Sequence, residues 1–208
     1  MKRQPILLTP TLEAEAHFQG YRMVCGVDEA GRGPLAGDVV AAAVILPEEV
    51  EYPGLNDSKK MTPRARERLY EEITATAIYA IASATPAEID EINILNAAML
   101  AMRRAIDALP CKADFALIDG NCQRGFTLPC RTVIGGDGIS PSIAAASVLA
   151  KVTRDRMCIA LDEEYPAYHF AKHKGYPTRE HMDLVRLLGP CPAHRKSFLG
   201  FLQKENPT

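Results

Sequence analysis

The sequence predicts an α/β domain with a mixed central sheet flanked by helices. Two apolar runs, residues 22–27 and 37–46, come first and are separated only by a Gly-rich loop, so they are expected to pair as antiparallel strands. From residue 77 onward, strand patterns alternate with helical patterns. An early meander followed by this alternation is typical of a mixed sheet with helices on its faces. A chain of 208 residues is long enough to bury one good core.

The later elements follow in order, each with its own signal. A helix over 61–73 has a Thr cap and a Pro at its first position, and a helix over 141–164 opens in the same way after Ser140. Apolar residues at three- and four-residue steps predict a helix over 86–109. The remaining predictions are strands at 77–85, 113–119 and 130–137, a loop at 165–178, a helix at 179–189, a leader at 1–20 with a helical piece at 12–18, and one domain over 21–208.

Composition is ordinary for a globular protein, with 47% hydrophobic and 24% charged residues. The longest apolar runs, such as 39–46, are too short to cross a bilayer. The N-terminus has a basic tip but only a three-residue apolar core, which is not a secretory signal. The six cysteines form no C-x-x-C pair, so reduced thiols in a cytoplasmic protein are expected.

Net charge is −2, which does not by itself indicate a nucleic-acid binder. Positive charge is nevertheless clustered in four short stretches, at 59–68, 150–156, 170–176 and 193–196. Such patches can attract phosphate groups even on a slightly acidic protein. The alternative is a set of solvated helix faces with ion pairs four residues apart, and charge alone favours that alternative.

Four acids, Asp28, Glu29, Asp119 and Asp137, fall at predicted strand ends or in adjoining loops, where they could converge at one edge of the sheet. Carboxylates gathered closely raise one another's pKa unless a cation compensates. Oxygen ligands of this kind suit Mg²⁺ or Mn²⁺, and two such ions can promote phosphodiester hydrolysis. The alternative for each single acid is a solvated loop residue or a helix cap.

The loop at 31–37, "GRGPLAG", is either a tight turn or a place where a ligand approaches the backbone closely. It is not a P-loop, because no Gly-Lys-Ser/Thr follows. Arg32 between two glycines presents a planar donor fork that suits phosphate or sugar recognition.

Six segments together resemble bacterial ribonuclease HII in order and spacing. The resemblance covers about residues 21–198. The segments are "GVDEAGRGPLAG", "LNDSKKMT", "LIDGN", "IGGDGISPSIAAASVLAKVTRDR", "HFAKHKGYPTREH" and "HRKSF". Asp38 stands where the family usually has proline, so one more acid near the site and an altered start of the second strand are expected.

The resemblance implies a ribonuclease H-like fold with a C-terminal helical segment. It also implies an endonuclease that cleaves RNA in RNA–DNA hybrids and at single ribonucleotides in duplex DNA, leaving 3′-hydroxyl and 5′-phosphate ends with Mn²⁺ or Mg²⁺ as cofactor. The family's catalytic and metal-binding acids map onto Asp28, Glu29, Asp119 and Asp137. Asp155, four residues after Lys151, is explained by an ion pair instead.

The resemblance also implies residues that bind the substrate. Gly31, Arg32 and Gly33 correspond to the loop that senses the 2′-hydroxyl, the group that distinguishes RNA from DNA. Tyr176 corresponds to the tyrosine that packs on the next sugar, although without the resemblance it would be a core or loop-packing residue. Lys59 either contacts phosphate or is solvated.

His173 and His194 lie in basic segments and are expected to be phosphate neighbours or capped surface residues rather than metal ligands. A rival family, ribonuclease HIII, shares the fold and reaction but lacks the Gly-Arg-Gly triplet. A non-catalytic hybrid-binding module would be expected to lack one or more acids. The expected partners are RNA–DNA hybrids and ribonucleotide-containing DNA, with no membrane; a monomer is assumed, and recruitment by a sliding clamp is left open.

Overall fold

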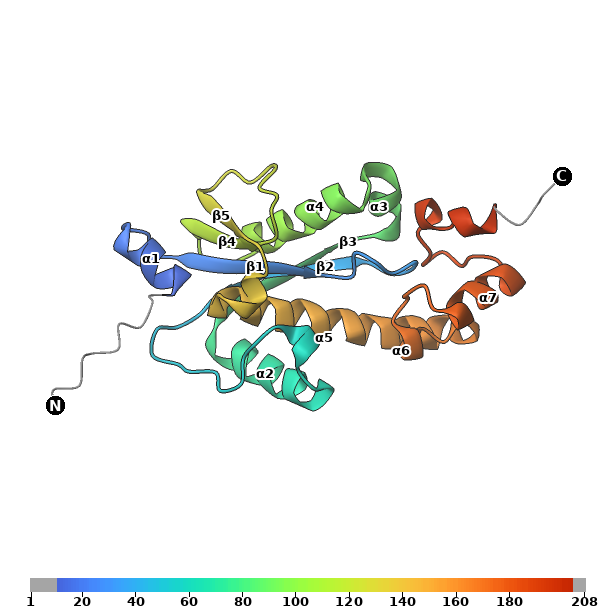
Figure 1. The fold of residues 1–208 in the computed structure, drawn as a ribbon, viewed down its shortest axis with the longest axis horizontal. Helices are drawn as coiled ribbons and strands as arrows, with labels where there is room; N and C mark the ends of the chain where they lie inside the picture. Colours follow the sequence, from blue (N-terminus) through green and yellow to red (C-terminus); the bar gives the residue numbers. More distant parts are fainter. Residues whose placement is uncertain (1–10, 204–208) are drawn as a thin grey trace, which may run out of the picture.

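The computed structural model describes residues 11–203, and its centre is one five-stranded mixed sheet (Figure 1). The strand order is β3-β2-β1-β4-β5. The first three strands form the predicted antiparallel meander, and β4 and β5 continue from β1 in parallel. The strands are β1 (Val24–Ala30), β2 (Val39–Ile45), β3 (Ile78–Ala84), β4 (Phe115–Asp119) and β5 (Cys130–Val133). This arrangement confirms the predicted fold class.

Helices cover both faces of the sheet (Figure 1). One face carries α4 (Ile94–Asp107), which packs on β2 and β3. The opposite face carries α5 (Pro141–Glu164), with α2 (Pro63–Thr76) packed on its outer side. At Gly26 in β1, an added Cβ would overlap the α5 backbone, so the strand and helix approach unusually closely. This close approach packs the middle of β1 directly against the first turn of α5.

The predicted helix caps are present. Thr62 accepts a hydrogen bond from the Ala65 N–H at the start of α2. Ser140 does the same for the Ile143 N–H at the start of α5. The single helix expected over 86–109 was wrong, because α3 (Pro86–Ile92) and α4 are separated by Asn93. Asn93 has a φ of 65° and caps α4, which a continuous helix could not accommodate.

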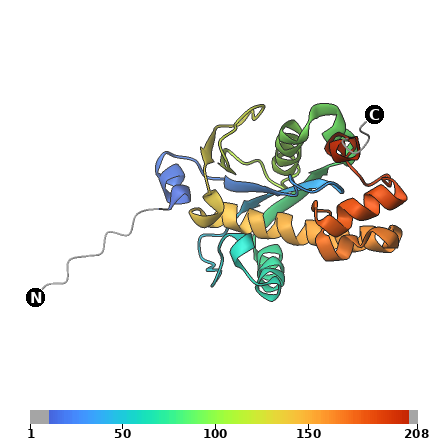
Figure 2. The same ribbon diagram turned by 45° about the vertical axis from the view of Figure 1, so that its right-hand side comes forward.

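The C-terminal segment gathers at one end of α5 (Figure 2). It contains α6 (Phe170–His173) and α7 (Arg179–Leu188), joined by irregular chain. The loop predicted over 165–178 was therefore partly wrong, because α6 and a short 3₁₀ turn (Pro166–Tyr168) lie within it. The apolar cluster of this segment includes Leu35 and Ala36, which belong to the loop after β1. The glycine-rich loop is thus packed against the C-terminal segment.

At the opposite end of the sheet lies α1 (Leu12–Phe18), the helical piece predicted for the leader. Its Ala16 packs in an apolar cluster with Val24 and Phe115. All six cysteines are free, as predicted. Within residues 11–203, no helix is both long and apolar enough to cross a membrane.

Candidate active site

Asp28 and Glu29 lie within β1 rather than beyond its end. The strand continues to Ala30, and both acids pair with residues of β2. The expectation that they follow the strand was therefore wrong, because the ladder with β2 extends past the last apolar residue, Val27. Asp28 is 3% exposed, and its Oδ1 accepts a hydrogen bond from the Glu29 N–H at 2.7 Å. A central strand thus holds both carboxylates on a rigid backbone.

Asp119 is the last residue of β4, the parallel neighbour of β1. Val27 pairs with Ile118, so the register places Asp119 beside Asp28. The Gly136 N–H donates to Asp119 Oδ1 at 2.7 Å, which ties the following loop to the same end of β4.

Asp137 lies in the short 3₁₀ turn of that loop and is 8% exposed. The structure therefore gathers all four acids predicted from the sequence at one end of β1 and β4.

The acids perturb one another electrostatically. Burial raises the pKa of Asp28 well above its usual value, and the charges of Glu29 and Asp119 raise it further. Burial also raises the pKa of Glu29, although Arg32, whose Nη1 lies 3.4 Å from Glu29 Oε1, partly offsets this. The pKa of Asp137 is raised by burial and by the neighbouring acids. The site therefore holds more negative charge than its cations balance.

Lys59 places an ammonium group close to this acidic group, with Nζ 3.8 Å from Asp137 Oδ2. Burial alone would lower its pKa, but the charges of Asp28, Asp137 and Asp57 raise it. Asp57 is a fifth acid that the sequence reasoning missed. Its charge is among the causes that raise the pKa of Asp137. It also accepts a bond from the Lys59 N–H at 2.9 Å. Its position beside Lys59 in "LNDSKKMT" was the available signal.

The donor set fits a hard divalent cation. The side chains at the site offer carboxylate oxygens, and their raised pKa values show that added positive charge would be stabilising. Within residues 11–203, no three acidic, cysteine or histidine side chains are already arranged around one point where an ion could sit.

Asp28→Asn is expected to stabilise the protein when chelator is present. A carboxyl whose folded pKa is raised binds more protons in the folded state, so wild-type stability falls as pH rises above the usual pKa of 3.8 toward the folded pKa. Asparagine removes this loss. Thermal melts in chelator from pH 4 to 8 should show a variant that is matched with wild type at low pH and more stable near neutral pH. A variant less stable at every pH would contradict this.

The glycine-rich loop and Tyr176 face the same cleft, which has a volume of about 260 Å³. A Cβ at Gly33 would lie 3.6 Å from Tyr176 Cε1, so the ring packs beside the loop. Gly31 has a φ of 101°, a conformation that glycine adopts without strain. Arg32, Gly33 and Tyr176 are all exposed. Residues lining the cleft include Glu29, Gly31, Arg32, Gly33, Lys59, Lys151, Arg154 and Tyr176.

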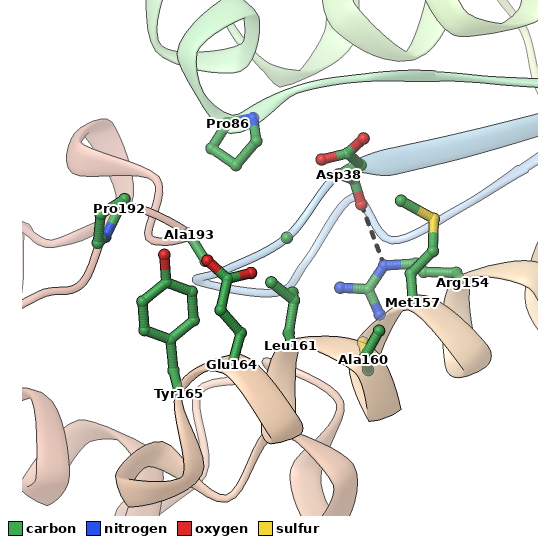
Figure 3. Close-up of a pocket in the computed structure, with 12 residues that line it drawn as sticks. Asp38, Pro86, Arg154, Met157, Ala160, Leu161, Glu164, Tyr165, Pro192 and Ala193 are labelled. Atoms are coloured by element: carbon green, nitrogen blue, oxygen red, sulfur yellow. Dashed lines mark hydrogen bonds between the residues drawn. The ribbon is translucent and has the colours of Figure 1, made fainter.

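Asp38, expected to add an acid to this site, lies elsewhere. Its Oδ2 accepts a hydrogen bond from Ser83 Oγ of β3 at 2.6 Å. Figure 3 shows its carboxylate turned away from Arg154, whose Nε donates to the Asp38 carbonyl at 3.2 Å. Asp38 and Leu161 line a separate pocket of about 400 Å³. The expectation was wrong because the side chain at the start of β2 points toward β3.

The expectation for His173 and His194 was also wrong. Both are buried, at 8% and 3% exposure, and neither is a surface residue beside phosphate. By contrast, the predicted ion pair between Lys151 and Asp155 is present at 2.6 Å. Two further buried residues, Arg154 and Arg195, were missed, since the sequence marked them only as members of basic clusters.

Comparison with known proteins places this geometry in one family. The family model described as Ribonuclease HII matches residues 25–200. A Ribonuclease HII from Caldicellulosiruptor saccharolyticus is 53% identical over 189 residues, which cover 90% of this chain and 92% of the relative. A Ribonuclease HII from Polaromonas sp. is 56% identical over 177 residues, covering 85% of this chain and 89% of the relative.

The solved structures agree. The structure of the PCNA:RNase HII complex from Archaeoglobus fulgidus contains a chain 25% identical to this one, with a TM-score of 0.74. The match covers 89% of this chain and 98% of that one. The shared fold, the family model spanning most of the chain and relatives above 50% identity lead to one conclusion: the chain belongs to the ribonuclease HII family of endonucleases.

Proposed function

We propose that this chain hydrolyses the RNA strand of RNA–DNA hybrids and incises duplex DNA at single embedded ribonucleotides, leaving 3′-hydroxyl and 5′-phosphate ends. The observation that carries the proposal is the placement of two kinds of group in one region. Four carboxylates lie together at the ends of β1 and β4. The exposed Arg32–Gly33 backbone and the Tyr176 ring line one cleft together with Glu29, a member of this acidic group.

The four acids are the proposed ligands for two divalent cations, Mg²⁺ or Mn²⁺. When bound, such ions activate a water and stabilise the leaving oxygen of a phosphodiester. The chain's own contribution is to hold Asp28 and Asp119 on neighbouring parallel strands and to anchor the Asp137 loop through the Gly136–Asp119 hydrogen bond. Lys59 supplies a positive charge close to Asp137. We propose that it also contacts a substrate phosphate.

The glycine loop is the proposed sensor of the ribose. Within residues 11–203, the peptide N–H groups of Arg32 and Gly33 have no hydrogen-bond acceptor, and both residues are exposed. A 2′-hydroxyl can both accept and donate hydrogen bonds, so it can satisfy such groups where deoxyribose cannot. Tyr176, 43% exposed and beside Gly33, offers an apolar ring face to the adjacent sugar.

A cleavage assay tests the proposal. The substrate is a labelled duplex with one ribonucleotide, and the reaction is run with Mg²⁺, with Mn²⁺ and with excess chelator. Cleavage only with a metal ion, with the ends mapped as 3′-hydroxyl and 5′-phosphate, is expected. An all-DNA duplex is the control. If neither the single-ribonucleotide duplex nor a continuous hybrid is cleaved, the proposal is wrong and the chain is instead a non-catalytic hybrid-binding module.

Arg32→Ala is expected to slow cleavage at a lone ribonucleotide by about tenfold to a hundredfold. This is the effect of losing one hydrogen bond that a charged group makes in the transition state. The acids remain in place, although Glu29 loses its 3.4 Å neighbour. Steady-state rates on the single-ribonucleotide duplex measure the effect. Arg131→Ala is a matched control, because its Nη1 pairs with Glu15 outside the cleft. An unchanged Arg32→Ala rate would mean that the Arg32 side chain makes no contact with the substrate in the transition state.

Two further points belong to the proposal. The Archaeoglobus fulgidus relative was solved as a PCNA complex, which supports recruitment of this chain by a sliding clamp. The six free cysteines fit a reducing compartment, so we propose that the reaction takes place in the cytoplasm. We also propose that the protein acts as a monomer.

A further inference from the structure

Arg195 lies beneath the glycine-rich loop and is fully buried. Its guanidinium makes five hydrogen bonds of 2.7–3.0 Å, and every acceptor is a main-chain carbonyl of this loop. The acceptors belong to Gly31, Arg32, Pro34 and Gly37, with Gly37 accepting twice. All five N–H groups of the guanidinium are therefore used, and the loop backbone is folded around one side chain.

Arg154 of α5 extends this arrangement. It is 2% exposed and donates to the carbonyls of Ala36, Asp38 and Lys174 at 3.0–3.2 Å. A Cβ at Gly31 would overlap the Arg154 side chain, so glycine is required there for packing as well as for its φ. The Lys174 contact matters because it links the loop to the segment that carries Tyr176.

The two guanidiniums explain why the loop presents N–H groups to the cleft. Burial and the charge of Arg154 lower the pKa of Arg195 to about 9, so Arg195 still carries its charge at neutral pH. A buried charge must be offset by nearby groups, and here the carbonyl dipoles do so. Drawing the Gly31 and Arg32 carbonyls inward toward Arg195 leaves the N–H groups of the same two trans peptide units, those of Arg32 and Gly33, facing outward.

Three histidines contact the Tyr176 segment. Two of them, His194 and His181, are joined by a hydrogen bond, and their neighbours define which ring nitrogen of each carries the proton. The Cys191 N–H donates to His194 Nδ1 at 3.1 Å, so the proton of His194 sits on Nε2. His194 Nε2 then donates to His181 Nε2 at 3.0 Å. The His181 proton must therefore sit on Nδ1, which donates to the Tyr176 carbonyl at 2.9 Å. His173, stacked on His181, accepts from the Gly175 N–H at 3.2 Å.

Burial keeps both imidazole rings neutral, because it lowers the pKa of His194 to about 4 and also lowers the pKa of His181. Each ring nitrogen of His181 and His194 therefore has a single role, donor or acceptor. Loss of the His194 donor leaves His181 without the partner that fixes its tautomer and orientation.

The backbone brings the two systems together. Ala36 and His194 form an isolated antiparallel bridge, with the Arg195 N–H donating to the Leu35 carbonyl at 2.8 Å. The Leu35 N–H in turn donates to the Gly175 carbonyl at 2.7 Å. Along an extended strand, successive side chains point to opposite sides. His194 therefore reaches the Tyr176 segment while its neighbour Arg195 reaches the glycine loop.

We propose that the dipeptide His194–Arg195 is a pair of positioning residues that sets the spacing between the 2′-hydroxyl-sensing loop and the Tyr176 ring. This inference rests on the proposed function, in which those two elements recognise adjacent sugars. Arg195 fixes the loop that reads the ribose, and His194, through His181, fixes the ring that reads the following deoxyribose. Specificity for the ribose–deoxyribose step thus depends on residues that touch neither sugar.

Arg195→Lys tests the first half. Lysine keeps the charge but offers donors at one point, so it cannot hold four carbonyls. Hydrogen exchange of peptides covering 31–37 and 174–178 is expected to speed up together, while peptides from β1 and β4 keep their protection. Cleavage should fall about tenfold or more on both a single-ribonucleotide duplex and a continuous hybrid. Arg156→Lys is the matched control, because Arg156 pairs with Glu67 at the exposed surface.

His194→Leu and His194→Gln test the second half. Leucine removes the donor, and the ratio of junction cleavage to continuous-hybrid cleavage is expected to fall about tenfold. Glutamine keeps an N–H donor for His181, so its ratio should stay close to wild type. Two results would overturn the inference. One is an unchanged rate of hydrogen exchange for residues 31–37 in Arg195→Lys, and the other is the same ratio of junction to continuous-hybrid cleavage in His194→Leu and wild type. Because exchange requires no turnover, it separates failure of this inference from failure of the proposed function.

Discussion

Asp119→Asn and Asp28→Asn are each expected to reduce cleavage about a thousandfold or more, which corresponds to ~4 kcal/mol of lost transition-state stabilisation. Both acids lie at the point where β1 and β4 run side by side, and each contributes negative charge to the proposed metal site. An amide keeps the size of the side chain but removes that charge. The measurement is the single-turnover rate on a duplex with one ribonucleotide, in Mg²⁺ and in Mn²⁺.

Asp183→Asn is the matched control, because Asp183 is a half-exposed acid of α7 that pairs with Arg186 at 2.8 Å, outside the cleft. It should retain the wild-type rate. Circular dichroism should show the same fold for all three variants. A fully active Asp119 or Asp28 variant, or a wild type fully active in excess chelator, would rule out metal-dependent hydrolysis through these acids.

Tyr176→Ala is expected to reduce cleavage at an RNA-to-DNA junction by about tenfold more than cleavage within a continuous hybrid. The ring lies beside Gly33 and is 43% exposed, so its free face is available to the sugar that follows the ribonucleotide. In the junction substrate that sugar is a deoxyribose, which presents no 2′-hydroxyl to the apolar ring. In the continuous hybrid it is a ribose, so less favourable contact is lost.

Tyr176→Phe separates the ring from its hydroxyl group. The ring face remains, so this variant should lie within a few-fold of wild type on both substrates. Rates on the two substrates are measured side by side for both variants. Equal losses on the two substrates, or a phenylalanine variant as impaired as alanine, would assign Tyr176 a structural or hydrogen-bonding role.

Elements with local signals were predictable from the sequence. The Ser140 cap followed by Pro141 predicted the start of α5, and the apolar run of β2 predicted a buried strand. The break at Asn93 was missed because apolar residues continue at helical spacing across it, and only the backbone turn reveals the boundary. The extension of β1 through Asp28 was missed because pairing with β2, rather than side-chain polarity, decides where that strand ends.

The residues of the candidate site also fall into those that were predictable from the sequence and those that were not. The four acids were predictable because each comes at or shortly after the end of an apolar run in the sequence, and the glycine loop because its composition is unusual. The buried environment of Arg195 was not, since its hydrogen-bond partners lie 158 to 164 positions earlier in the chain. The histidine chain through His194 was hidden for the same reason. Its members looked like surface residues in a basic segment, and only tertiary packing buries them.

The dependence of the glycine loop on Arg195 has a consequence during synthesis. Domains fold as the chain emerges from the ribosome, N-terminal portions first. All strands of the sheet end by Val133 and the last of the four acids is Asp137, so the residues that supply the acidic group are made before Arg195, which follows Asp137 by 58 positions. The loop cannot take its final shape until Arg195 arrives. A nascent chain therefore contains the proposed metal-binding carboxylates before it contains the residue that shapes the proposed ribose-sensing loop.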